Sequence, residues 1–116
     1  MDQPPARKVY VRPSAQELLQ GAPARVGSLL AQYAKLVEGY AEQAGVTGTR
    51  TEVLGYTDPE DGSRQLMIAH LIQMPQVDAK TYRAQLGTAI EAWVRGLAEA
   101  DLDLVQEWFI LDVRTE

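Results

Sequence analysis

The stretch Leu-Met-Ile-Ala-His-Leu-Ile-Gln-Met, residues 66–74, decides the fold because it is apolar on both of its faces. Side chains alternate along a strand, so one face carries Leu66, Ile68, His70, Ile72 and Met74, and the other carries Met67, Ala69 and Leu71. A strand of this kind has to be covered on both sides. The helices predicted for the rest of the chain suffice for one covering layer, so we expect a second copy of the protein to supply the other.

The residues before this strand predict two helices behind a short strand. Residues 8–12 alternate between polar and apolar side chains and form a candidate strand. Ser14 and Glu17 match a capping box and predict a short helix over residues 14–20. An apolar stripe at steps of three and four predicts a long helix over residues 23–44, which Gly45 is placed to cap.

The other half of the chain predicts a hairpin, a helix and a last strand. A strand over residues 49–56 leads into an Asp-Pro-Glu-Asp-Gly turn and then into the apolar strand, 64–74. Asp78 is a suitable N-cap for a helix over residues 79–99, on which Glu91 and Arg95 form an exposed i,i+4 pair. Residues 104–114 alternate in the manner of a strand.

This order is β-α-β-β-α-β, or α-β-β-α-β if residues 8–12 form no strand. The order resembles the ferredoxin-like arrangement, which implies an α+β fold of two layers, with both helices on one face of an antiparallel sheet. In that fold the first strand lies in the middle of the sheet, whereas the charged segment 8–12 suits an edge. An edge position leaves a gap between the third and fourth strands, which either closes directly or takes a partner's strand. We divide the chain into an N-terminal arm, 1–13, and one α+β domain, 14–116.

Composition excludes several classes of protein. The chain of 116 residues has no cysteine, which removes disulfides, thiolate metal sites and cysteine nucleophiles. It has neither an apolar run long enough for a membrane span nor a secretory signal, so we expect a cytoplasmic protein. The net charge of −5 and the lack of a massed basic face argue against nucleic-acid binding. The absence of asparagine and the excess of arginine over lysine favour a bacterial source.

His70 is the only histidine, and it permits two interpretations. It is either a base or ligand in a pocket under the sheet, or a packed side chain whose ring nitrogens have local partners. Aromatic side chains at helical spacing are likewise either pocket walls or core. The candidate pocket residues are His70, Tyr33, Tyr40 and Trp93. The hydroxyl groups of buried tyrosines need partners, and His70 is one candidate.

No other residues suggest chemistry. The acidic group Asp58, Glu60 and Asp61 fails the spacing of a calcium loop and indicates a turn. No serine lies in the context of a nucleophile. We therefore predict no catalytic residues, no metal site and no cofactor. Glu99, Asp101 and Asp103 form an acidic patch that is a candidate surface for a protein partner.

Two functions remain open. The first is a non-enzymatic protein-interaction or regulatory module that acts as a homodimer. The second is a small-molecule-binding protein or cofactor-independent enzyme of the dimeric α+β-barrel type, with a pocket between helices and sheet. Whether the protein is an enzyme stays undecided, and the scarcity of catalytic groups favours the first function.

Overall fold

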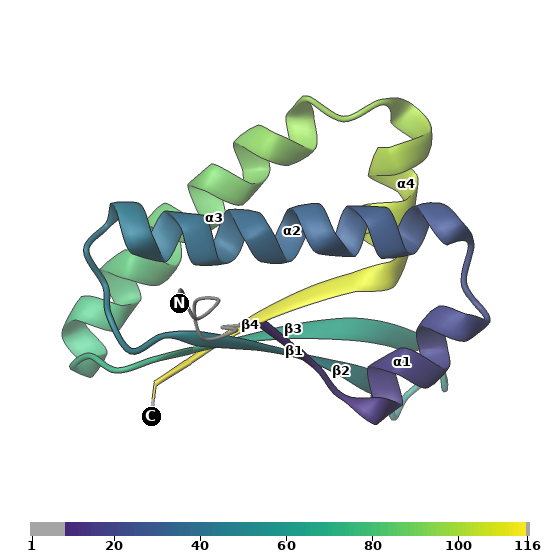
Figure 1. Ribbon diagram of the computed structural model, residues 1–116, viewed down its shortest axis with the longest axis horizontal. Helices are drawn as coiled ribbons and strands as arrows, with labels where there is room; N and C mark the ends of the chain where they lie inside the picture. Colours follow the sequence, from purple (N-terminus) through teal and green to yellow (C-terminus); the bar gives the residue numbers. More distant parts are fainter. Residues whose placement is uncertain (1–8, 116) are drawn as a thin grey trace, which may run out of the picture.

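The computed structural model describes residues 9–115. Within them, the fold consists of one mixed sheet of four strands, together with four helices (Figure 1). The elements in chain order are β1 (Val9–Val11), α1 (Pro13–Gln20), α2 (Ala24–Gln43), β2 (Arg50–Thr57), β3 (Arg64–Ile72), α3 (Gln76–Arg95), α4 (Glu99–Trp108) and β4 (Phe109–Thr115). The fold is α+β, as predicted. Residues 1–8 of the predicted N-terminal arm and Glu116 lie outside the described residues.

The strands lie in the order β1-β2-β3-β4. The pairs β1–β2 and β3–β4 are parallel, and only the hairpin β2–β3 is antiparallel, so the prediction of an antiparallel sheet is wrong. β1 lies at an edge and not in the middle, so the strand order differs from the ferredoxin-like one. The gap between the third and fourth strands closes by direct pairing of β3 with β4.

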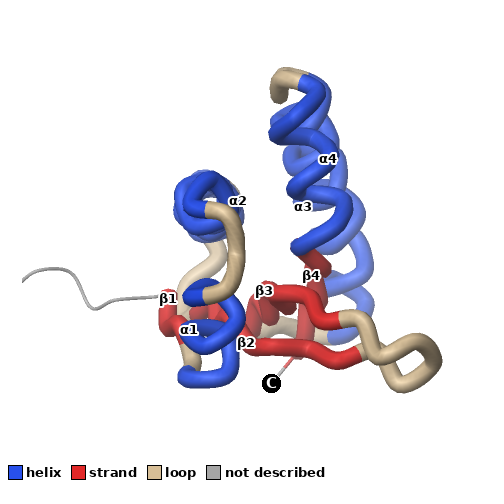
Figure 2. The backbone as a smooth tube through the Cα atoms, turned by 90° about the vertical axis from the view of Figure 1, so that its right-hand side faces the viewer, coloured by secondary structure: helices blue, strands red, loops and turns tan. Residues whose placement is uncertain are grey.

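The two crossover connections have opposite hands. The helices α2 and α3 share one core with the same face of the sheet, and Figures 1 and 2 show α2, α3 and α4 on the same side of it. β3 and β4 run opposite to β1 and β2, while the strand order continues across the sheet in one direction. Since about 98% of parallel crossovers are right-handed, one of these two is an exception.

The core lies between the helices and one face of the sheet. The predicted alternation in the apolar strand is confirmed there, because Leu66, Ile68, His70 and Ile72 are each fully buried. The predicted long helix is also confirmed as α2, whose stripe buries Val26, Leu29, Leu30, Tyr33 and Val37. Each large side chain moved from water into such a core contributes roughly 1.5–3 kcal/mol.

The prediction of a strand over residues 104–114 is wrong in its first half. Residues 99–108 form the helix α4, and the strand begins only at Phe109. Glu99 and Asp101 lie in the first turn of α4, where carboxylates favour a helix. The alternating residues 104–108 also fit a helix, because Leu102 and Val105 recur at a step of three. The element order is therefore β-α-α-β-β-α-α-β.

Two predicted helix starts differ from those observed. The N-cap of α1 is Arg12, so the capping box at Ser14 and Glu17 is wrong; the Ser14 hydroxyl accepts a hydrogen bond from the Gly55 N–H at 2.9 Å instead. The N-cap of α3 is Pro75, and Asp78 lies within the first turn. Gly45 does follow the end of α2 with a φ of 73°, a conformation that suits glycine at a helix C-terminus.

Candidate functional site

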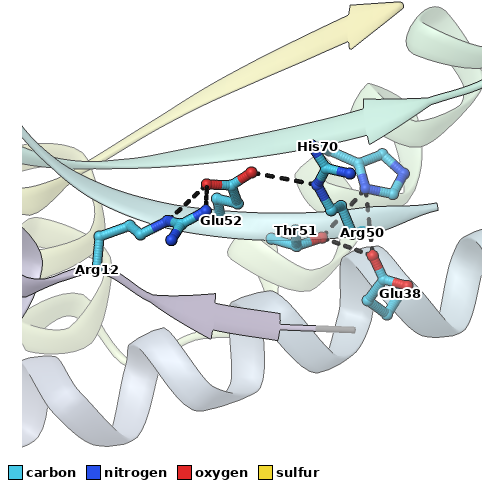
Figure 3. Close-up of polar contacts among 6 residues, drawn as sticks. All are labelled: Arg12, Glu38, Arg50, Thr51, Glu52 and His70. Atoms are coloured by element: carbon cyan, nitrogen blue, oxygen red, sulfur yellow. Dashed lines mark hydrogen bonds and ion pairs between the residues drawn. The ribbon is translucent and has the colours of Figure 1, made fainter. Parts of the chain in front are cut away.

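A network of polar side chains links α2 to α3 across the helix-facing side of the sheet. α2 contributes Glu38, the start of β2 contributes Thr51 and its neighbour Thr49, β3 contributes His70, and α3 contributes Tyr82. Figure 3 shows Glu38, Thr51 and His70 pointing toward one another. Thr51 and His70 are 0% exposed, and Thr49 and Tyr82 are each 5% exposed.

Short hydrogen bonds join these groups. The hydroxyl groups of Thr49 and Thr51 donate to the two carboxylate oxygens of Glu38, at 2.9 Å and 2.6 Å. The Thr51 oxygen also lies 3.1 Å from Nδ1 of His70, and Nδ1 lies 3.4 Å from Oε2 of Glu38. On the other side of the ring, Nε2 lies 2.7 Å from the Tyr82 hydroxyl.

The count of protons assigns the tautomer of His70. Thr51 has one hydroxyl proton and donates it to Glu38, so its oxygen can only accept from Nδ1–H of His70. In the neutral ring Nε2 then carries no proton and accepts a hydrogen bond from the Tyr82 hydroxyl. The Thr51 oxygen and Oε2 of Glu38 share Nδ1–H of His70, and no buried side-chain nitrogen or oxygen within residues 9–115 lacks a partner.

The same contacts set the ionisation of Glu38 and Tyr82. Burial raises the pKa of Glu38, but hydrogen bonds from His70, Thr51 and Thr49 outweigh it, and the pKa lies below its ordinary value of 4.5. Burial, together with the charge of Glu38 and the proximity of Tyr40, raises the pKa of Tyr82 to about 12. The network therefore holds an ionised carboxylate at one end and a protonated phenol at the other.

This arrangement resembles a proton relay in its groups, but only its Glu38 end reaches solvent, with 12% of that side chain exposed, while His70 is fully buried. His70 lines neither the groove of about 460 Å³ nor the groove of about 570 Å³ found among the described residues. A catalytic base has to reach a substrate proton within hydrogen-bond distance. The geometry of the network thus matches the packed histidine with local partners, the second of the two interpretations drawn from the sequence.

The four candidate pocket residues separate into two pairs. His70 is buried in the network, and Tyr33 is 5% exposed in the core, where it makes edge-on contacts with Trp93 and Phe109. Tyr40 and Trp93 instead line a groove of about 460 Å³ between α2 and α3, together with Gln32, Lys35, Leu36, Gly39, Gln43 and Ala89. The structure does not bring all four residues to one cavity.

The acidic patch is partly engaged within the chain. The Arg25 guanidinium of α2 donates to both carboxylate oxygens of Asp101, at 2.9 Å and 2.7 Å, and fastens α4 to α2. The pair lowers the pKa of Asp101 through the hydrogen bond with Arg25. Glu99 and Asp103 are exposed on the same helix.

Three members of the network, Glu38, Thr49 and Thr51, were not predicted from the sequence. Glu38 follows Ala34 by one turn at the border of the buried stripe, Thr51 lies on the inward face of β2, and Thr49 lies just before that strand. Polar residues at core positions are the signal that points to such a network, because buried polar groups have partners.

Within residues 9–115, the face of the sheet away from the helices has no covering layer. Leu54, Met67 and Ile110 form a row across β2, β3 and β4 on this side, since Leu54 pairs with Met67 and Met67 with Ile110. Among the described residues no helix or strand lies over this open face (Figures 1 and 2). All three side chains are half-buried by their neighbours in the sheet.

Other kinds of site are not found within residues 9–115. No three acidic or histidine side chains in this part of the chain are grouped so as to hold a metal ion. No helix in it combines the length and the apolar character that a membrane span requires.

Comparisons with family models, with curated proteins and with solved structures find no match to this chain. The function is therefore inferred from the geometry of the molecule alone.

Proposed function

We propose that the protein is a non-enzymatic interaction module that acts as a homodimer, with the open face of its sheet as the contact surface. The observation that carries this proposal is the apolar row Leu54, Met67 and Ile110, which no element of residues 9–115 covers. Exposed apolar patches rimmed by polar residues are typical of protein–protein contact sites. The burial of His70 away from both grooves favours an interaction module over the second function.

The charges beside this row also suit a second copy. Arg12 and Arg50 both bind the Glu52 carboxylate, at 2.6 Å and 3.2 Å (Figure 3). Arg114 pairs with Asp112 on β4. Glu52 and Asp112 share one cross-strand row through Ala69, and Arg50 and Arg114 share the next through Leu71. The face thus presents both signs in adjacent rows, which a surface that pairs with itself requires.

Sedimentation equilibrium over a range of concentrations tests the homodimer. We expect a species of about twice 12.8 kDa for the unaltered protein. Ile110→Asp places a carboxylate in the middle of the apolar row and should give the monomer, with circular dichroism unchanged. Leu54→Glu is a second variant of the same row.

Val77→Asp is the matched control, because Val77 is an exposed apolar residue at the start of α3, with 76% of its surface accessible. We expect this variant to sediment like the unaltered protein. A single 12.8 kDa species at the highest concentration reached would contradict the homodimer.

One observation favours the second function, the binding of a small molecule. The groove between α2 and α3 has Tyr40 and Trp93 as walls, with Leu36, Gly39 and Ala89 beside them. Apolar grooves with a few polar groups at the rim are typical ligand sites. Quenching of tryptophan fluorescence by small aromatic carboxylates, lost in Gly39→Leu, is the expected result if this groove binds them, because Lys35 at its rim carries the opposite charge.

A further inference from the structure

We infer that the outer edge of β1 and the apolar groove beside it dock an extended, acid-flanked segment of another protein by strand addition. This inference names the kind of partner that the proposed interaction module binds, and it rests on that proposed function. It does not require the homodimer, because the edge of β1 and the open face of the sheet are different surfaces.

The groove lies between β1, α1 and α2 and has a volume of about 570 Å³. β1 contributes Val9 and Val11, α1 contributes Leu19, and α2 contributes Leu30, Ala31 and Ala34. Its walls are therefore almost wholly apolar. Val53 of β2 also lines the groove, so the groove lies on the face of β1 that points toward α2.

The backbone of β1 offers the matching hydrogen bonds. The Arg12 N–H donates to the Val53 carbonyl at 2.9 Å, so by alternation the backbone groups of Tyr10 are also directed toward β2, while the Arg12 carbonyl accepts from Ala15 and Gln16 at the start of α1. Val9 and Val11 then direct theirs outward. The Val11 carbonyl accepts a hydrogen bond from the Gln16 side chain at 3.2 Å, which marks the end of the usable edge. Val9 N–H, Val9 C=O and Val11 N–H have no partner within residues 9–115.

The apolar groove and the outward-directed backbone groups of β1 lie at the same place, and both involve the alternate residues Val9 and Val11. In an added strand, the side chains on the same face as Val9 and Val11 would enter the groove, and the alternate ones would lie beside Tyr10. Strand addition takes its affinity from main-chain hydrogen bonds and its specificity from pockets for alternate side chains. The groove therefore selects a short segment with apolar residues at alternate positions.

The charges around the edge select the partner. Lys35 is the one charged residue in the lining of the groove, and it is exposed. Arg12, whose side chain is half-exposed and pairs with Glu52 at 2.6 Å, follows β1 directly. Acidic residues that flank the segment would meet these cations. The β1 strand of a second copy brings its own basic residues instead, so pairing of like edges is disfavoured.

Fluorescence anisotropy with two labelled peptides tests the inference. Both peptides contain a Val-Thr-Val-Thr-Val core, flanked by glutamates in one and by lysines in the other, and the protein is the full chain carrying Ile110→Asp. We expect saturable binding of the glutamate peptide and binding of the lysine peptide that is at least about tenfold weaker, a difference of roughly 1.4 kcal/mol. Equal binding of both peptides, or of neither, would overturn the inference.

Val11→Pro provides the sharpest variant. Proline removes the outward N–H of Val11 but none of the hydrogen bonds from β1 to β2, since those involve Tyr10 and Arg12. We expect loss of peptide binding with an unchanged melting temperature. Unchanged peptide affinity in this variant would show that the edge is not the docking site.

Ala31→Glu and Ala31→Lys are a matched pair of opposite charge at an exposed position in the groove lining. The glutamate variant should weaken the glutamate peptide about tenfold relative to the lysine variant. Sedimentation of Val11→Pro without Ile110→Asp separates the two proposals. A dimer there leaves the open-face contact intact, whereas a monomer would show that a second copy occupies the β1 edge, and would overturn the inference.

Discussion

At the scale of single residues, Thr51 holds the buried network together because its hydroxyl serves two partners at once. In Thr51→Val, the Nδ1–H of His70 stays buried with only its 3.4 Å contact to Glu38, and Oε2 of Glu38 loses the hydrogen bond from the Thr51 hydroxyl. We expect this variant to lower the free energy of unfolding by about 1–3 kcal/mol, measured by urea titration with tryptophan fluorescence. Thr57→Val, at the exposed end of the same strand, should stay within about 0.5 kcal/mol. Equal effects of the two variants would refute the role of Thr51.

Glu38 makes stability depend on pH in a defined direction. Its pKa in the folded protein lies below the ordinary value of 4.5, so the stability it contributes is fully present above pH 4.5 and is lost as pH falls through the lower folded pKa. Glu52, Asp61 and Asp101 have lowered pKa values too, so the unaltered protein loses stability in acid from several groups. We expect Glu38→Gln to be less stable at pH 7 and to lose less on acidification below pH 4.5. A parallel acid slope in both proteins would contradict this prediction.

Only two features of the candidate site were predictable from the sequence. The position of His70 on the buried face follows from strand alternation, and a tyrosine as its partner follows from the need to pair buried hydroxyl groups. Glu38 and the threonines are distant in sequence from His70, and they meet it only because β2 pairs with β3 under α2. The hairpin was predicted from its turn, but no local pattern gives its register or the position of α2 over it.

At the scale of elements, Gly55 determines how closely α1 approaches the sheet. A Cβ atom there would lie 2.8 Å from the Ser14 carbonyl oxygen and 3.2 Å from the Leu18 side chain. We expect Gly55→Ala to destabilise the protein by about 1–3 kcal/mol, because the backbone of α1 has to move. Gly87→Ala in α3 has no atom within 4 Å of the new Cβ and should stabilise by about 0.5–1 kcal/mol. Thermal melts of both variants check the opposite signs.

The prediction of helices and strands succeeded where the apolar residues fitted only one spacing, helical or alternating, and failed where they fitted both. The stripe of α2 has only a helical reading. Residues 104–108, in contrast, alternate like a strand and also lie on a helix with Leu102, and the acidic first turn of α4 settles the choice. Packing of α4 against α2, with the ion pair between Arg25 and Asp101, also favours the helix. This contact joins residues distant in sequence, so a local pattern cannot reveal it.

At the scale of the whole molecule, the hairpin β2–β3 lies at the centre of the sheet and β1 at its edge. Slow hydrogen exchange should therefore concentrate at Val53 and Ile68, which are fully buried in the two central strands. The amides of Val9 and Val11, directed away from β2, should exchange fastest among the strands. Fast exchange at Val53 would contradict the observed strand order.

The strand order itself could not be predicted from the sequence. The interleaved order of the ferredoxin-like arrangement and the sequential order observed in this protein share the same succession of strands along the chain. The rule that crossovers are right-handed also argues against the arrangement found, because one of its two crossovers breaks that rule. The polar character of residues 8–12 was the one local sign that β1 lies at the edge.

The turn Asp58–Gly62 is the only covalent link between the two β-α-α-β halves, and it is exposed at its tip. A chain cut between Glu60 and Asp61 would yield two fragments, each with one central strand, one edge strand and two helices. Such fragments, unable to bury their apolar faces alone, should recognise each other through β2 and β3 when produced together. The molecule would then behave as a split protein whose reassembly reports the encounter of whatever is fused to its halves.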